Sequence, residues 1–133
     1  MYLKHKIIEL KDKAILELEN KIVDIIDNKS EMSIYHIHVR KTAGTTVNFA
    51  FLSNHDAREP VKSFYEKLAK KSNNRIISSK KIFVGWNKEL INTGKYSYAF
   101  SHIPLHDLNI PKRVFKFACL RDPVERLISH YNM

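Results

Sequence analysis

A short loop of small residues follows the first buried strand that the sequence predicts. It holds six residues and begins with a cation: Lys41, Thr42, Ala43, Gly44, Thr45 and Thr46. Small residues let consecutive backbone N–H groups approach an anion, and a helix that starts directly after them adds the positive end of its dipole. The loop therefore has the chemistry of a phosphate site, although an ordinary strand-to-helix turn has the same pattern. It is not the GxxxxGK[ST] spacing, because the lysine precedes the glycine.

A second segment that could hold an anion lies near the end of the chain, in RDPVERLIS. Asp122, Pro123 and Glu125 have the spacing of an N-cap, a first helical proline and a capping-box glutamate. Arg121 then lies between a strand and this helix, and Ser129 lies two turns along the helix. A guanidinium is a planar fork that suits phosphate. The alternative is that Arg121 only pairs with a neighbouring carboxylate.

HVRKTAGTT and FACLRDPVERLISHY together resemble the paired motifs with which sulfotransferases bind 3′-phosphoadenosine-5′-phosphosulfate (PAPS). The resemblance is strongest to the branch that includes heparan sulfate 2-O-sulfotransferases and related carbohydrate enzymes. It covers residues 34–131 and is dense in the two motifs and in SHIP, residues 101–104. It implies an enzyme that transfers the sulfuryl group of PAPS, as co-substrate, to a hydroxyl of a carbohydrate, with no metal ion.

The resemblance also implies roles for individual residues. Lys41 matches the lysine that meets the bridging oxygen of the phosphosulfate, and residues 42–46 match the cradle around the 5′ side. Arg121 and Ser129, with the family's spacing preserved, match the pair that holds the 3′-phosphate. His102 matches the histidine base of the 2-O-sulfotransferases. Lys41 and His102 are therefore the expected catalytic residues.

Two residues depart from the family's usual first motif. Arg40 stands where proline is common, and Ala43 stands where glycine is common. Neither change removes a backbone donor. The family's domain normally continues beyond the second motif, whereas this sequence stops four residues after Ser129. We therefore expect residues 30–133 to be a sulfotransferase-like nucleotide-binding domain, truncated at its C-terminus and preceded by a helix over residues 1–29.

Alternating strands and helices must position these residues. Apolar and β-branched runs predict strands in IYHIHV, IIS, KIFVG, YSYAFSH and VFKFACL. Helical patterns lie in VNFAFL, PVKSFYEKLAKK, NKELINT and the segment that begins at Asp122. The alternation predicts an α/β fold, in which a parallel sheet has flanking helices, right-handed crossovers and a P-loop-like strand-loop-helix after its first strand.

The first segment, residues 3–27, contains no Gly or Pro and predicts an amphipathic helix of about three heptads. Apolar side chains recur there at a seven-residue spacing, and we call them the heptad stripe: Ile8, Ile15, Ile22, Leu18 and Ile25. The stripe could pack against the chain's own domain, or it could form a short coiled coil in a homodimer.

The charge of the chain favours anionic partners. Its 133 residues carry a formal net charge of +9, which suits nucleotides, sulfated glycans, nucleic acid or an acidic membrane. A P-loop-like kinase or NTPase would need a hydroxyl that binds magnesium and an acidic residue at the end of another strand. Thr42 could supply the hydroxyl, but no predicted strand ends in a suitable aspartate. A non-enzymatic polyanion-binding module would leave RDPVER unexplained, and we expect no specific nucleic-acid partner. A truncated family member that binds the nucleotide without catalysis is a further alternative.

The single cysteine, Cys119, excludes an internal disulfide and a multi-cysteine zinc site. Since it lies in the apolar run VFKFACL, a buried and inert thiol is expected. Charges every few positions in the first 27 residues exclude a signal-peptide core and a membrane span, so a cytoplasmic protein is expected.

Other histidines show no metal-ligand spacing with cysteines or carboxylates. We expect structural or exposed roles for three of them: His5, His36 and His38. His106 and Asp107 lie close enough to His102 in sequence to orient its ring.

Overall fold

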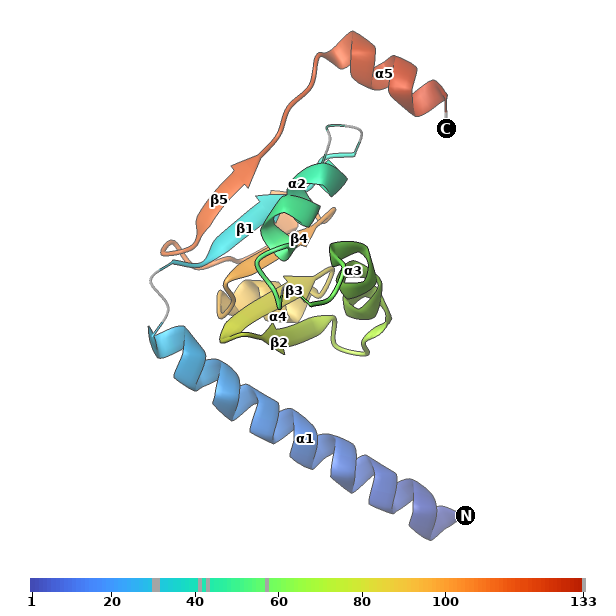
Figure 1. Ribbon diagram of the computed structural model, residues 1–133, viewed down its shortest axis with the longest axis vertical. Coiled ribbons are helices and arrows are strands. Elements are labelled where there is room, and N and C mark those ends of the chain that lie inside the picture. The colour runs from blue at the N-terminus through green and yellow to red at the C-terminus, as the bar shows by residue number, and fades with distance from the viewer. Residues whose placement is uncertain (30–31, 41, 43, 57, 133) are drawn as a thin grey trace.

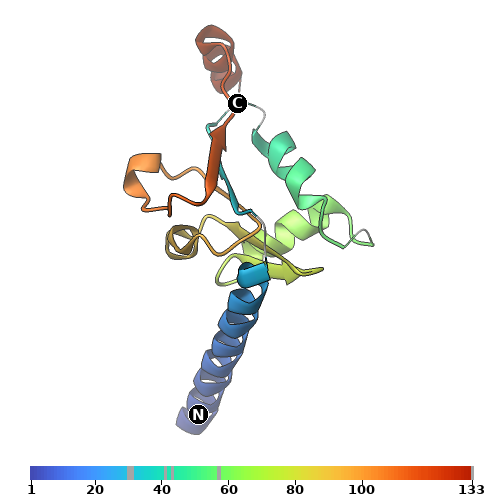
Figure 2. The same cartoon turned by 90° about the vertical axis from the view of Figure 1, so that its left-hand side faces the viewer.

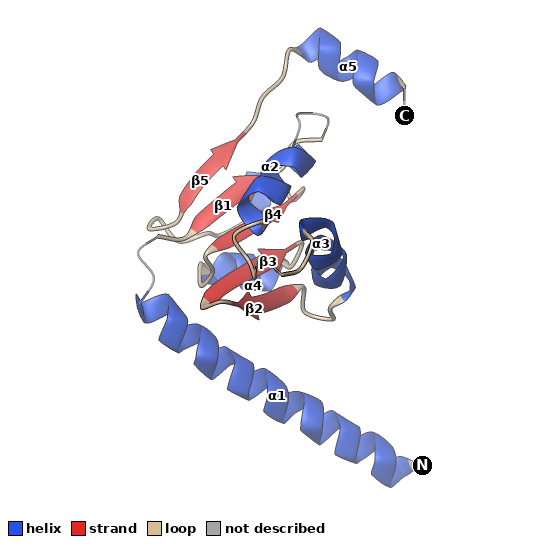
Figure 3. Cartoon of the chain, viewed as in Figure 1, coloured by secondary structure: helices blue, strands red, loops and turns tan. Residues whose placement is uncertain are grey.

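The computed structural model describes residues 1–29, 32–40, 42, 44–56 and 58–132. At its centre is a five-stranded sheet with the strand order β2-β3-β4-β1-β5 (Figure 3). The strands are β1 (Ile34–Ile37), β2 (Arg75–Ser78), β3 (Lys81–Gly85), β4 (Tyr98–Ser101) and β5 (Phe115–Ala118). The predicted α/β class is confirmed, since β1 is parallel to both β4 and β5, and β3 is parallel to β4.

The strand β2 departs from the parallel arrangement. It pairs with β3 in antiparallel register, from Arg75 opposite Val84 to Ser78 opposite Lys81. The two strands are joined by only Ser79 and Lys80, both with a positive φ (51° and 63°). Such a short connection can join only antiparallel strands, and positive φ at both central residues is the geometry of a tight hairpin.

Helices cover both faces of the sheet. Figure 2 shows α2 (Gly44–Leu52) and α3 (Val61–Lys70) on one face, with α4 (Lys88–Thr93) and the short helix η1 (Leu105–Asp107) on the other. Each face has its own apolar core because side chains alternate along a strand. One core contains Tyr35, Ile82, Val84, Ile91, Tyr96 and Ala99. The other contains Leu52, Phe64, Leu68, Phe83, Tyr98 and Phe100.

The helix α1 (Tyr2–Lys29) contacts the domain through its C-terminal part, and its N-terminal part projects away from the domain (Figure 1). Val23 is 2% exposed in the core, and Ile26 packs beside it. The side chains of the heptad stripe remain between 40% and 62% exposed, although Ile15 lines a pocket with Lys71 and Asn73. The predicted helix is therefore present, but the domain leaves much of the stripe uncovered.

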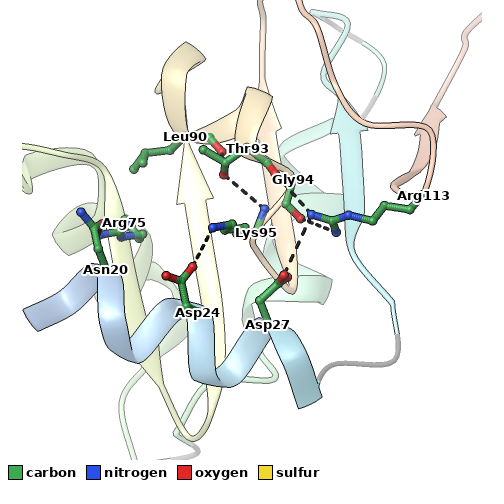
Figure 4. Close-up of polar contacts among 9 residues, drawn as sticks. All are labelled: Asn20, Asp24, Asp27, Arg75, Leu90, Thr93, Gly94, Lys95 and Arg113. Carbon is green, nitrogen blue, oxygen red and sulfur yellow. Dashed lines mark hydrogen bonds and ion pairs between the residues drawn. The ribbon is translucent and has the colours of Figure 1, made fainter. Parts of the chain in front are cut away.

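Polar contacts complete the attachment of α1. Figure 4 shows Asp24 reaching Lys95, at 2.7 Å, and Asp27 reaching Arg113, at 4.0 Å. Nearer to the N-terminus of the helix, Glu19 pairs with the buried Arg75 at 2.7 Å. Ion pairs on one side of the helix thus hold it beside β2, β3 and the turn after α4.

The last two elements lie at the periphery. β5 is an edge strand, and its Phe115 is 57% exposed. Cys119 after it is half-buried, so the predicted buried thiol is wrong; a strand at the edge is not covered on both sides. The helix α5 (Pro123–Tyr131) has no buried residue. Among the described residues, no helix has both the length and the apolar character needed to cross a membrane.

Candidate functional site

The carboxyl ends of three parallel strands meet at one edge of the sheet. Ile37 of β1 pairs with Ser101 of β4 and with Ala118 of β5, and these three residues end their strands. The segments that follow them are the glycine-containing loop, His102 and the second motif. They therefore leave the sheet at the same edge, where ligands bind in open α/β sheets.

The described part of the glycine-containing loop leads into α2; Lys41 and Ala43 lie outside the described residues. Thr42 is 5% exposed, and its hydroxyl donates to the carbonyl of Val39 at 2.6 Å. Gly44, Thr45 and Thr46 form the first turn of α2, which contains no acidic residue. Backbone N–H groups in a first helical turn have no carbonyl partner within the helix, so this turn can accept an anion.

Gly44 is required by close packing. A Cβ at this position would overlap the imidazole of His38. His38 directly follows the last residue of β1, and its ring fills the space beside the first turn of α2. The glycine therefore lets the start of the helix lie directly against this ring.

The second motif begins its helix as the sequence predicts. The Asp122 carboxylate accepts from the N–H groups of Val124 and Glu125, at 2.9 and 3.1 Å, with Pro123 in the first turn. Glu125 also lies 3.8 Å from the guanidinium of Arg121, and both side chains are exposed. The predicted alternative pairing is thus present, but an exposed pair contributes only about 0–1 kcal/mol. A doubly charged phosphate can compete for this guanidinium.

The two motifs are in direct contact. Nε of Arg126, in α5, donates to the carbonyl oxygen of Arg40, in the segment after β1, at 3.0 Å. This bond brings α5 to the loop, as its position beyond the same sheet edge in Figure 1 also shows. Ser129 lies one turn further along α5 and is half-buried. No role was predicted for Arg126 from the sequence; its position one turn after the N-cap of a phosphate-type motif was the available signal.

His102 follows β4 directly and is exposed. Its Nδ1 lies 3.0 Å from the carbonyl oxygen of His38, and the two rings are 4.3 Å apart between centroids. A carbonyl can only accept, so Nδ1 of His102 donates and Nε2 keeps its lone pair in the neutral ring. His106 instead lies 3.5 Å from Asp107. The hypothesis that these two residues orient His102 is wrong, because His38 makes the contact.

Behind His102 lies a buried group of polar side chains. His36 and Asn48 are fully buried, and His36 Nδ1 lies 2.8 Å from Asn48 Oδ1. The Tyr98 hydroxyl donates to the same oxygen at 2.6 Å. Burial is the main cause that lowers the pKa of His38 to about 4, and the nearby His102, His36 and Arg40 act in the same direction. The sequence predicts structural or exposed roles for His36 and His38. Their i, i+2 spacing was the available signal that both side chains lie on the same face of the sheet, the face that carries α2.

Metal ligands are not gathered in the described part of the chain. No group of three or more His, Cys, Asp or Glu side chains there could hold a metal ion. The cations that the structure describes around the site are guanidinium groups, at Arg40, Arg121 and Arg126.

The fold is an α/β domain in which a glycine-containing strand-loop-helix lies beside a histidine at the carboxyl edge of a mostly parallel sheet. The model of the sulfotransferase family matches residues 24–133, and the chain belongs to that family. The match contains both motifs and His102 and leaves most of α1 outside. No curated protein and no solved structure matches the chain.

Proposed function

We propose that the chain binds PAPS at the carboxyl edge of its sheet and transfers the sulfuryl group to a hydroxyl of a carbohydrate. The observation that carries the proposal is the convergence of both motifs and His102 at one sheet edge. The family match supports a sulfuryl-transfer reaction rather than another use of such a site.

The residues present fit a nucleotide with anionic groups at two positions. The first turn of α2 offers N–H donors without an opposing carboxylate, and Gly44 lets this turn pack directly against the ring of His38. Lys41, outside the described residues, would neutralise charge on the leaving phosphate. Arg121 and Ser129, on the segment that Arg126 holds against the loop, would bind the 3′-phosphate.

In the reaction that we propose, Nε2 of His102 accepts the proton of the acceptor hydroxyl. A new bond forms between the acceptor oxygen and sulfur, while the bond between sulfur and the 5′-phosphate oxygen breaks, and its electron pair leaves with 3′-phosphoadenosine-5′-phosphate. Imidazole is the side chain that most often accepts a proton at neutral pH. The exposed position of His102 leaves its Nε2 accessible to an acceptor.

A carbohydrate acceptor is supported by the charge of the chain and by the motif branch that it resembles. A net charge of +9 favours association with anionic polysaccharides. Transfer of labelled sulfate from PAPS to a desulfated glycosaminoglycan, compared with transfer to a small phenol, tests this preference. Transfer to the phenol alone would contradict the carbohydrate assignment.

His102→Ala tests the proposed base. It should lower sulfuryl transfer by on the order of a hundred-fold or more, the usual scale for losing a general base, while nucleotide affinity stays within about two-fold. The matched control is His106→Ala, which removes an exposed imidazole from η1 and should leave transfer unchanged. Transfer at the parent rate in His102→Ala would show that the base lies elsewhere.

A kinase or NTPase is less well supported. The hydroxyl of Thr42, the candidate magnesium ligand, is buried and donates to Val39. A magnesium ligand needs an oxygen that faces the nucleotide.

We also propose that the heptad stripe of α1 forms a homodimer. Its side chains are exposed and follow the spacing of a two-stranded coiled coil. Ile15→Lys, at the centre of the stripe, should shift the protein to monomer in sedimentation velocity, whereas the control Glu17→Lys, off the stripe, should not. A parent protein that is monomeric at high concentration would refute the dimer.

A further inference from the structure

The amide of Asn48 relates the proton positions of two buried histidines. Its Oδ1 accepts from the Tyr98 hydroxyl at 2.6 Å and lies 2.8 Å from Nδ1 of His36. Its Nδ2 lies 3.4 Å from Nδ1 of His38. An amide oxygen only accepts and an amide nitrogen only donates. His36 therefore carries its proton on Nδ1, whereas neutral His38 carries it on Nε2, the atom beside Gly44.

The carbonyl of His38 defines a third proton position, on Nδ1 of His102. The ring of His38 also supports His102 by contact, since the two planes are inclined by only 34° at a centroid distance of 4.3 Å. The Cδ2 and Nε2 atoms of the same ring lie against Gly44. A single imidazole thus touches both the start of α2 and the candidate base.

The surroundings keep His38 neutral. The titratable and charged groups that face it are basic: His36 at a centroid distance of 5.5 Å, His102 and Arg40. From α2 it meets Asn48 and Gly44, neither of which carries a charge. Burial and these neighbours lower the pKa of His38, so its ring holds no charge that would oppose a proton arriving on His102.

We propose that His38 is a positioning residue for His102: its carbonyl selects the tautomer with a free Nε2, and its neutral ring holds that imidazole in place. The inference rests on the proposed function, because it assigns His102 as the base. His38 itself need not touch either substrate for this role.

The first test determines the histidine tautomers by NMR and does not require catalytic turnover. Long-range proton–nitrogen NMR correlations of the parent chain at neutral pH should show His102 and His36 protonated on Nδ1, the minor form of free histidine. His38 should be protonated on Nε2 and stay neutral as the pH is lowered toward about 4. The exposed His5 is the control for an unconstrained ring. Protonation of neutral His102 on Nε2, or a charged His38 at neutral pH, would overturn the proposal.

The second test is a double-mutant cycle on sulfuryl transfer. His38→Ala should lower transfer by roughly ten-fold or more through misplacement of the base, whereas His38→Phe, which keeps a ring, should retain most of it. Neither variant should lower transfer further in the His102→Ala background. Equal losses in both backgrounds would show that His38 acts independently of His102. Failure to bind the nucleotide would refute the proposed function instead, while the tautomer measurement would still decide the role of His38.

Discussion

Replacing Glu19 by glutamine tests what attaches α1 to the domain. The side chain of Arg75 is only 4% exposed, and its Nε lies 2.7 Å from Oε1 of Glu19, whose side chain is 14% exposed. Asn73 donates to the same carboxylate at 3.1 Å, and Lys71 lies 3.6 Å from it. The substitution therefore removes the only carboxylate that is paired with this buried cation in the described part of the chain.

The magnitude follows from burial. Removing one partner of a buried pair costs about 3–5 kcal/mol, because the other charge is left without compensation. The glutamine amide would keep an acceptor oxygen, and Asn20 still accepts from Arg75 at 2.7 Å, so we expect a cost of about 2–3 kcal/mol. The matched control is Asp24→Asn, on the same helix (Figure 4). Its pair with Lys95 has the same 2.7 Å distance but side chains 54% and 44% exposed, so about 0.2–1 kcal/mol is expected.

The assay is urea unfolding followed by circular dichroism and by the fluorescence of Trp86, at low and at high salt. Glu19→Gln should lower the unfolding midpoint without changing the slope, and added salt should have little effect on the difference. The smaller loss in Asp24→Asn should shrink further with salt. Equal losses in the two variants would refute the reasoning from burial. Nucleotide affinity should be unchanged in both, since α1 lies away from the sheet edge that carries the motifs (Figure 1).

Three further predictions concern the site itself. Burial lowers the pKa of His38 from 6.5 to about 4, so the unfolded chain binds a proton at a higher pH than the folded chain does. The free energy of unfolding should therefore fall as the pH drops from about 6.5 to about 4. Urea midpoints measured over this pH range should depend less on pH in His38→Phe. Gly44→Ala should destabilise the fold, because overpacking against His38 costs about 1–3 kcal/mol and the higher helix propensity of alanine stabilises by at most about 1 kcal/mol. Calorimetry of the same variant should show weaker nucleotide binding. Arg121→Ala should weaken binding of 3′-phosphoadenosine-5′-phosphate by about ten- to a hundred-fold and leave ADP unaffected; an unchanged affinity for the first nucleotide would remove the role of the second motif.

Local chemistry made much of the fold predictable from the sequence. The run KIFVG forms β3 over the same residues, and the cap at Asp122 starts α5 where the sequence places it. The hairpin between β2 and β3 was not predicted as antiparallel, because Ser79 and Lys80 adopt positive φ without the Gly or Asn that usually marks such a turn. The orientation of α1 was also not predictable, since periodicity identifies an apolar stripe but not which face the domain covers.

The site was predictable as a set of motifs rather than as a geometry. The placement of β1 between β4 and β5 brings His102 and the second motif to the same edge, and strand order is not encoded in the spacing of either motif. The contact of His38 with His102 depends on that order, because the two residues are 64 positions apart. The need for glycine at position 44 follows from the same ring and is visible only in three dimensions.

The most direct test of the central claim is a calorimetric titration of the parent chain with 3′-phosphoadenosine-5′-phosphate and, in the same buffer and salt, with ADP. We predict that the 3′-phosphorylated nucleotide binds about ten- to a hundred-fold more tightly, the scale of one charge-assisted contact to the additional phosphate. Equal or tighter binding of ADP, or no binding of the 3′-phosphorylated nucleotide, would contradict the proposed PAPS site.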